Sequence, residues 1–150
     1  LENKKIQLYV KPFGDPTAAG SVITEHAAPI NVPVYIWRTN QVLITLRAKD
    51  FAFVLEESLS HIFQIIHANR LRVSLIQSSA VTISVCVDNS RFVMPAIEQL
   101  QEAYRVTWNE NLSLLTIRGT TPDILKQEQQ GRDILLSQLT RRTATLVIKD

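Results

Sequence analysis

Two short apolar runs, followed by apolar residues at helical spacing, mark the middle of this chain. The runs at residues 34–37 and 42–46 predict two strands separated by Thr39-Asn40-Gln41. The longer spacing that follows predicts an amphipathic helix over about residues 53–68, ending at Asn69. Its apolar stripe consists of Phe51, Leu55, Leu59, Ile62, Phe63 and Ile66.

Two more strands and a second helix are predicted next. The strands cover residues 72–77 and 81–87, with the polar turn Ser78-Ser79-Ala80 between them. Asp88-Asn89-Ser90 offers helix caps, and Pro95 is expected in the first turn of the helix. The helix stripe is Val93, Ile97, Leu100 and Tyr104, and a strand over residues 106–108 follows. The order β-α-β-β-α-β predicts an α+β fold of the ferredoxin-like type.

A second and shorter pattern begins after residue 110. Residues 112–117 predict a strand, Thr121-Pro122-Asp123 starts a helix that reaches about Leu139, and residues 143–149 predict a final strand. These elements are too few for a complete second unit. The second unit is therefore either degenerate or takes a strand from elsewhere, such as residues 34–38.

The first part of the chain differs from the rest. A short strand over residues 6–10 runs into a turn-rich segment, and further breaks come at Pro29 and Pro33. We therefore divide the chain into a leading segment (1–32), one strand (33–39), a first unit (40–110) and a partial second unit (111–150).

Composition narrows the class of protein. The chain has 150 residues, a formal net charge of +2 and one cysteine. The small charge argues against a nucleic-acid or membrane partner. The chain has no run of about 20 apolar residues, which is the length needed to span a bilayer. A single cysteine permits no internal disulfide and favours a cytoplasmic location. The start at Leu1, without methionine or secretory signal, predicts a fragment of a longer protein.

No catalytic motif is recognisable. Phosphate-binding loops, dinucleotide fingerprints and nucleophile elbows are missing, and four glycines leave little material for them. His61 and Glu57 lie one helical turn apart, but two ligands do not make a metal site, and a solvated helix face is the favoured interpretation. Cys86 on an interior strand is best explained by packing. We therefore predict neither catalytic residues nor a metal site here.

Residues 71–88, L-R-V-S-L-I-Q-S-S-A-V-T-I-S-V-C-V-D, carry the main functional signal. A strand that ends in a serine-rich turn displays hydroxyl groups and backbone amides, which can hold the carboxylate and ammonium groups of an amino acid. Chemistry alone favours a plain polar hairpin. However, the segment resembles the ACT-domain signature of aspartokinases at Val73, Leu75, Ile76, Ser78, Ser79, Val81 and Asp88.

Three other segments resemble the same family in the same order. Residues 40–46, N-Q-V-L-I-T-L, and 113–119, S-L-L-T-I-R-G, resemble the opening strands of its first and second ACT units. Residues 10–23, V-K-P-F-G-D-P-T-A-A-G-S-V-I, resemble the segment that closes its kinase domain. The corresponding residues there are Lys11, Asp15, Pro16, Gly20 and Ser21.

The sequence also departs from the family pattern. Ser74 stands where lysine-responsive members carry an aspartate, and Ala80 stands in place of a glutamate. The first predicted helix begins Glu56-Glu57-Ser58, without the usual glycine. Replacing a charged partner by a hydroxyl weakens ammonium binding by on the order of 1–3 kcal/mol.

The resemblance implies the regulatory region of an aspartokinase, with tandem ACT units that form a homodimer and bind an effector, lysine or threonine. The parent enzyme would phosphorylate L-aspartate on the route to lysine, threonine and methionine, with ATP and magnesium bound in a kinase domain outside this chain. The implied effector-binding residues are Asp50, Phe51, Ser74, Gln77, Ser78 and Ser79. Two alternatives stay open, a dimerisation module with a decayed effector site and an ACT sensor of another amino-acid enzyme. The latter leaves residues 10–23 unexplained.

Overall fold

The computed structural model describes residues 7–23, 32–49 and 55–149, which fall into two compact units divided between Val32 and Pro33. In the first unit, β1 (Leu8–Val10) and β2 (Ser21–Ile23) form an antiparallel pair. Gly20 has a φ of 68°, and a Cβ atom there would collide with the backbone oxygen of Val10. The turn into β2 therefore requires glycine.

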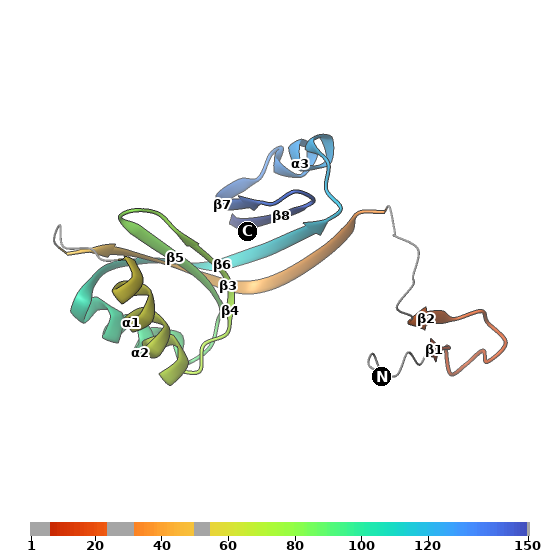
Figure 1. The fold of residues 1–150 in the computed structure, drawn as a ribbon, viewed down its shortest axis with the longest axis horizontal. Coiled ribbons are helices and arrows are strands. Elements are labelled where there is room, and N and C mark those ends of the chain that lie inside the picture. Colours follow the sequence, from red (N-terminus) through yellow and green to blue (C-terminus); the bar gives the residue numbers. More distant parts are fainter. Residues whose placement is uncertain (1–6, 24–31, 50–54, 150) are drawn as a thin grey trace. The chain divides into compact units, whose positions relative to one another are not determined.

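The second unit is built on a six-stranded antiparallel sheet in the order β4-β5-β3-β6-β8-β7 (Figure 1). Its two central strands, β3 (Val34–Ala48) and β6 (Tyr104–Arg118), each have 15 residues. β5 pairs with the second part of β3, and β8 pairs with the second part of β6. The sheet therefore has two halves that share β3 and β6. The outer strands are β4 (Val73–Ser78), β5 (Thr82–Asp88), β7 (Asp133–Leu139) and β8 (Thr143–Lys149).

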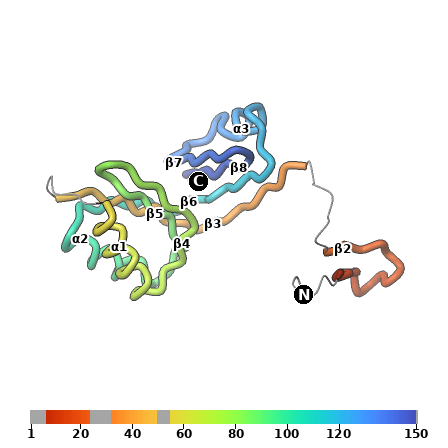
Figure 2. Tube along the Cα trace, viewed as in Figure 1, coloured from red at the N-terminus to blue at the C-terminus, as the bar shows by residue number. Residues whose placement is uncertain are grey.

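Asn40 and Asn111 mark the change from one half to the other. Their φ angles are 54° and 56°, in the left-handed region that asparagine tolerates better than most residues. The register between β3 and β6 shifts in this region, between Arg38 and Leu43. Figure 2 shows both strands continuing side by side through this point. The asparagines therefore allow a change of register without ending the ladder.

The first half is a complete ferredoxin-like unit. Helices α1 (Leu55–Ala68) and α2 (Val93–Ala103) lie on one face of its strands (Figure 1). The order β3-α1-β4-β5-α2-β6 is the βαββαβ arrangement. Alternate residues of β3 and β5 pack beneath the helices in one core, which contains Val42, Ile44, Leu46, Ile62, Ile66, Ile83, Val85, Val87, Val93, Ile97, Leu100 and Tyr104.

The second half follows the same plan with one helix fewer among its described residues. Helix α3 (Pro122–Gln129) packs Ile124 and Leu125 against a core of Leu115, Ile117, Leu146 and Ile148. Residues 34–38 of β3 supply the fourth strand, since Val34 lies opposite Arg118 and Arg38 lies opposite Leu114. The strand that precedes the first half along the sequence therefore completes the second half.

A third cluster fills the face of the sheet opposite the helices. It joins Leu43, Leu75 and Cys86 of the first half to Leu112, Leu114, Leu136 and Val147 of the second. The two outermost strands also approach each other, because Nε2 of Gln138 in β7 donates to the backbone oxygen of Ile76 in β4 at 3.3 Å. The sheet is thus curled around this cluster.

An internal repeat relates the two halves. Residues 40–47 read N-Q-V-L-I-T-L-R and residues 111–118 read N-L-S-L-L-T-I-R. The β4–β5 hairpin closes with a bond from the Ser79 nitrogen to the Thr82 oxygen at 2.8 Å, and the β7–β8 hairpin with one from Thr140 to Thr143 at 2.9 Å. Gln41 therefore corresponds to Leu112, and Ser79 corresponds to Thr140.

The predicted α+β fold of ferredoxin-like units is confirmed, but two strand assignments were wrong. Residues 34–37 and 42–46 belong to one strand, β3, and residues 106–108 and 112–117 belong to β6. Polar residues interrupt the apolar pattern at each bend, whereas the left-handed asparagines leave the pairing almost continuous. Tyr104 begins β6 instead of ending the second helix.

Two helix ends also differ from the prediction. Helix α2 has Phe92 at its N-cap without a side-chain bond, and the Ser90 hydroxyl accepts from the Phe92 nitrogen instead. The third helix ends at Gln129 and not near Leu139, because the chain turns at Gly131 with a φ of 73° and continues as β7. A bulge between Ile134 and Leu136 directs these two residues into different cores, which gives β7 its irregular apolar spacing.

Candidate functional site

The turn between β4 and β5 holds three of the predicted effector residues. Gln77, Ser78 and Ser79 are all exposed. The turn is closed by the backbone bond from Ser79 to Thr82, and the Ser79 hydroxyl donates to the same oxygen at 3.4 Å. These hydrogen bonds therefore fix the backbone conformation of the turn on which Gln77 and Ser78 are exposed.

Ser74 lies at the other end of β4, in a bulge between Val73 and Leu75. Its hydroxyl donates to Oε1 of Gln41 at 3.0 Å and accepts from Nη1 of Arg38 at 3.2 Å. Ser78 follows about 13 Å along the strand, at roughly 3.3 Å per residue. The structure therefore places Ser74 in a separate cluster of polar side chains. Asp50 and Phe51 lie outside the described residues.

That cluster centres on Gln41, which the sequence did not single out. Gln41 is only 2% exposed. Its Nε2 donates to Oδ1 of Asp88 at 2.8 Å and to the backbone oxygen of Thr39 at 3.2 Å, while its Oε1 accepts from Ser74. Nη1 of Arg38 lies 4.0 Å from Oδ1 of Asp88. These contacts tie β3, β4 and β5 together where the two halves of the sheet meet.

A signal for this network was present in the sequence. Gln41 is one of the polar residues, Thr39-Asn40-Gln41, that separate the two predicted strands and lie within β3 in the structure. A buried amide must find partners, since burying one without hydrogen bonds costs about 1–3 kcal/mol. The partners, however, come from three strands and follow only from their register.

Cys86 also borders this network. It is completely buried, and its Sγ lies 3.7 Å from Oε1 of Gln41. Burial, and to a smaller extent the negative charge of Asp88, raise the pKa of the Cys86 thiol from 9.0 to about 11. Because the thiolate is the reactive form, Cys86 is a packing residue and not a nucleophile.

This pKa predicts a loss of stability at alkaline pH. The folded protein keeps the Cys86 proton that the unfolded chain releases above about pH 9. Its contribution to the free energy of unfolding is therefore complete below pH 9 and is lost as the pH rises through 11. The loss amounts to roughly 2 kcal/mol at pH 11. Urea unfolding of the wild type and of Cys86→Ala, compared at pH 7 and pH 11, measures it. Equal pH dependence of the two proteins would contradict the assignment.

Within the three described stretches, no group of His, Cys, Asp and Glu side chains has the arrangement of a metal site. Nδ1 of His61 lies 3.1 Å from the hydroxyl of Tyr104, which joins α1 to β6. None of the described helices has the length and apolar character needed to cross a membrane.

The sequence matched no protein-family model and no curated protein. The structure, in contrast, resembles several solved structures. Aspartate kinase from Clostridium acetobutylicum is 12% identical and covers 99% of this chain with a TM-score of 0.79. Aspartokinase III from E. coli, in complex with lysine and aspartate, is 18% identical and covers 99% with a TM-score of 0.75. A domain assigned as the C-terminal regulatory domain of an aspartate kinase from Porphyromonas gingivalis W83 is 13% identical and covers 80% with a TM-score of 0.70.

The chain has the fold of aspartokinase regulatory regions. It spans 39% and 36% of the Clostridium and E. coli enzymes, but 88% of the Porphyromonas domain. TM-scores of 0.70–0.79 establish this shared fold, whereas identities of 12–18% leave the ligand unassigned. The likeness to the two aspartokinases extends over almost the whole chain.

Proposed function

We propose that this chain is the regulatory region of an aspartokinase, and that it senses an amino acid and forms a homodimer. The observation that carries the proposal is the tandem of ferredoxin-like halves, in which residues 34–38 complete the second half ahead of the first. Solved aspartokinases cover this arrangement almost completely. The resemblances at residues 10–23, 40–46, 71–88 and 113–119 support it independently.

In this proposal the parent enzyme transfers the γ-phosphoryl group of ATP to the β-carboxylate of aspartate. ATP, magnesium and the catalytic residues belong to a kinase domain outside this chain. The β1–β2 hairpin would form the end of that domain. Its many exposed apolar side chains support a contact with further protein surface, namely Leu8, Tyr9, Val10, Phe13, Val22 and Ile23.

The proposed effector site is centred on the β4–β5 turn. It uses Gln77, Ser78 and Ser79 together with Asp50 and Phe51. The second half supports this choice, because there the equivalent connection and turn are neighbours. The nitrogens of Gly119 and Thr120 donate to the backbone oxygen of Arg142 at 2.6 and 3.0 Å. Ser74 would act indirectly, by holding β4 against Gln41.

Homodimer formation is supported by the exposed apolar surface of β3. Val34, Tyr35, Ile36 and Trp37 are consecutive, and each is 42–48% exposed. Among the described strands, residues 34–38 pair only with β6, so their other edge is unpaired. An unpaired apolar edge is a surface that proteins usually cover.

One observation favours a second candidate function, a dimerisation scaffold with a decayed effector site. Ser74, the position of the family's charged ligand partner, is engaged by Arg38 and Gln41, and Ala80 offers no charge in the turn. A scaffold of this kind would dimerise without responding to amino acids.

A double substitution in the turn separates the two functions. If the chain senses lysine or threonine, Ser78→Ala combined with Ser79→Ala should weaken binding by at least about tenfold, since two hydrogen-bonding groups are lost. Calorimetric titration of the 150-residue chain with each amino acid measures the affinity. Ser137→Ala, on exposed β7, is the matched control and should bind normally.

The same double variant, built into a full-length enzyme, should abolish feedback inhibition. Unchanged affinity in the double variant would contradict the proposed site. Dimers that bind neither amino acid would favour the scaffold.

A further inference from the structure

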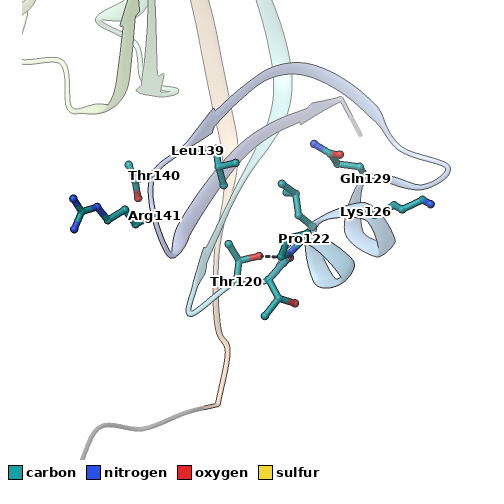
Figure 3. A pocket seen from close by; sticks show the side chains of 9 residues that line it. Thr120, Pro122, Lys126, Gln129, Leu139, Thr140 and Arg141 are labelled. Carbon is teal, nitrogen blue, oxygen red and sulfur yellow. Dashed lines mark hydrogen bonds between the residues drawn. The ribbon is translucent and has the colours of Figure 1, made fainter.

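Two places in the second half expose apolar side chains. One is the pocket between the start of α3 and the β7–β8 turn, whose apolar lining consists of Pro122, Leu125 and Leu139 (Figure 3). Lys126 and Arg141 extend away from this pocket, so neither cation is placed to select a ligand inside it. The other place is the apolar run at residues 34–37, at the start of β3, where the free strand edge defines the kind of partner that fits.

The side chains of residues 34–37 lie on both faces of the sheet. Trp37 lies opposite Leu115, a residue of the core beneath α3, and directly opposite residues of an antiparallel pair share a face. Successive side chains of a strand alternate, so Tyr35 points to this face as well. Val34 and Ile36 therefore point to the other face. All four side chains are 42–48% exposed, so their exposure does not depend on the face.

The feature that these four residues share is a free edge. Residues 34–38 pair with β6 on one side and, within the described part of the chain, with no strand on the other. A helix packed on one face of the sheet would cover only two of the four side chains. A strand added at the free edge would contact all four, and it would also pair the backbone groups that point outward.

The free edge is short and has defined ends. Pro33 precedes it and has no backbone N–H to donate, and Asn40 leaves the strand conformation with a φ of 54°. Arg38 is the one charged residue between them. Its Nη1 is held by Ser74 at 3.2 Å and lies 4.0 Å from Asp88. The edge therefore offers five residues, 34–38, to a partner strand, and four of them are apolar.

We propose that this edge pairs with the same edge of a second copy of the chain, antiparallel, about a two-fold axis at Ile36. In this register Ile36 lies opposite its own counterpart in the second copy. Tyr35 lies opposite the counterpart of Trp37, and Val34 lies opposite the counterpart of Arg38. The inference rests on the proposed homodimer and names the strand through which it forms.

The edge is complementary to itself in this register. A two-fold axis perpendicular to the sheet pairs identical strands antiparallel and closes the contact after two copies. Residues matched by the axis at Ile36 are an even number of positions apart, so each side chain meets one on its own face. An aromatic ring then meets an aromatic ring, because Tyr35 faces Trp37. The two Arg38 side chains do not face each other, so no like charges are opposed.

Sedimentation velocity of the 150-residue chain tests the contact. A ladder of five residues is a small interface, so we expect a monomer–dimer equilibrium between about 1 and 300 µM. Ile36→Lys would place two ammonium groups opposite each other at the axis and should raise the dissociation constant at least about tenfold. Val73→Lys, at a residue that is 36% exposed on the outer strand β4, is the matched control and should dimerise like the wild type.

Mixing two charged variants separates loss of the contact from loss of folding. Ile36→Glu should weaken the dimer as Ile36→Lys does, whereas an equimolar mixture of the two should associate at least about tenfold more tightly than either alone. Ile36→Cys should give a disulfide-linked dimer on mild oxidation, since directly opposite Cβ atoms lie about 4.5–5.5 Å apart. Val73→Cys should not, and neither should the wild type, whose single cysteine, Cys86, is buried.

The outcomes distinguish this inference from the homodimer on which it rests. A wild-type dimer with an unchanged dissociation constant in Ile36→Lys would overturn the pairing and leave a homodimer formed by another surface. Charged variants that stay monomeric when mixed, or a failure of Ile36→Cys to crosslink, would likewise overturn the pairing. A wild type that remains monomeric up to about 300 µM would overturn both the pairing and the homodimer.

Discussion

Replacing Leu115 by alanine is expected to lower the free energy of unfolding by about 3–4 kcal/mol. Leu115 is completely buried on β6, opposite Trp37 of β3 and Leu146 of β8. Truncation removes its contacts and leaves a cavity in the core beneath α3. Urea unfolding followed by circular dichroism measures the loss.

The same experiment tests whether the two halves unfold together. Because β3 and β6 belong to both halves, we expect one unfolding transition before and after the substitution. Leu139→Ala, on the exposed end of β7, is the control and should cost less than about 1 kcal/mol. Two separate transitions would show that the halves are independent domains, against the shared-strand architecture.

Replacing Gln41 by alanine is expected to cost about 3 kcal/mol. The substitution removes the hydrogen bonds to Asp88 and Ser74 and leaves a cavity at a site that is 2% exposed. A hydrogen bond to a charged group contributes about 1.5–3 kcal/mol, so the bond to Asp88 accounts for much of the effect. Urea unfolding at pH 7 measures it.

Gln41→Leu is the matched comparison, because the repeat places Leu112 at the equivalent position. Leucine restores most of the volume but not the hydrogen bonds, so it should recover only part of the loss, to a cost of about 1–2 kcal/mol. If Gln41→Ala cost less than about 1 kcal/mol, the network would not hold β3, β4 and β5 together.

Much of this fold could be predicted from its sequence because the hydrophobic spacing is regular. The final strand over residues 143–149 was predicted with its observed bounds, and α1 was predicted to within two residues. These elements each bury one continuous apolar face, so their period is visible along the chain.

The shared strands could not be predicted in the same way. Two residues with positive φ, Asn40 and Asn111, bend β3 and β6 without ending them, and an asparagine in a sequence is equally consistent with a loop. The end of α3 was missed because the bulge in β7 gives residues 134–136 an unbroken apolar run. Pairing with β8, a contact outside the local sequence, decides that segment in favour of a strand.

The candidate sites also differ in whether their residues are adjacent in sequence or are brought together by the fold. The serine-rich turn was found because its residues are adjacent in sequence. Ser74, in contrast, was grouped with the turn by motif, whereas the bulge at that position directs its hydroxyl to Gln41. The pocket beside α3 combines residues from α3 and the β7–β8 turn, and the predicted helix through residue 139 had concealed that turn.

The central claim, that this chain senses an amino acid, is tested most directly by thermal unfolding with millimolar lysine, threonine, methionine or S-adenosylmethionine. A ligand present at about 100 times its Kd stabilises the folded state by roughly 2.7 kcal/mol, which raises the midpoint by several degrees in a chain of this size. We expect one of the amino acids to raise the midpoint by this amount, and the variant with Ser78 and Ser79 changed to alanine to lose the response. An unchanged midpoint with every ligand would contradict the claim and leave the chain as a dimerisation scaffold.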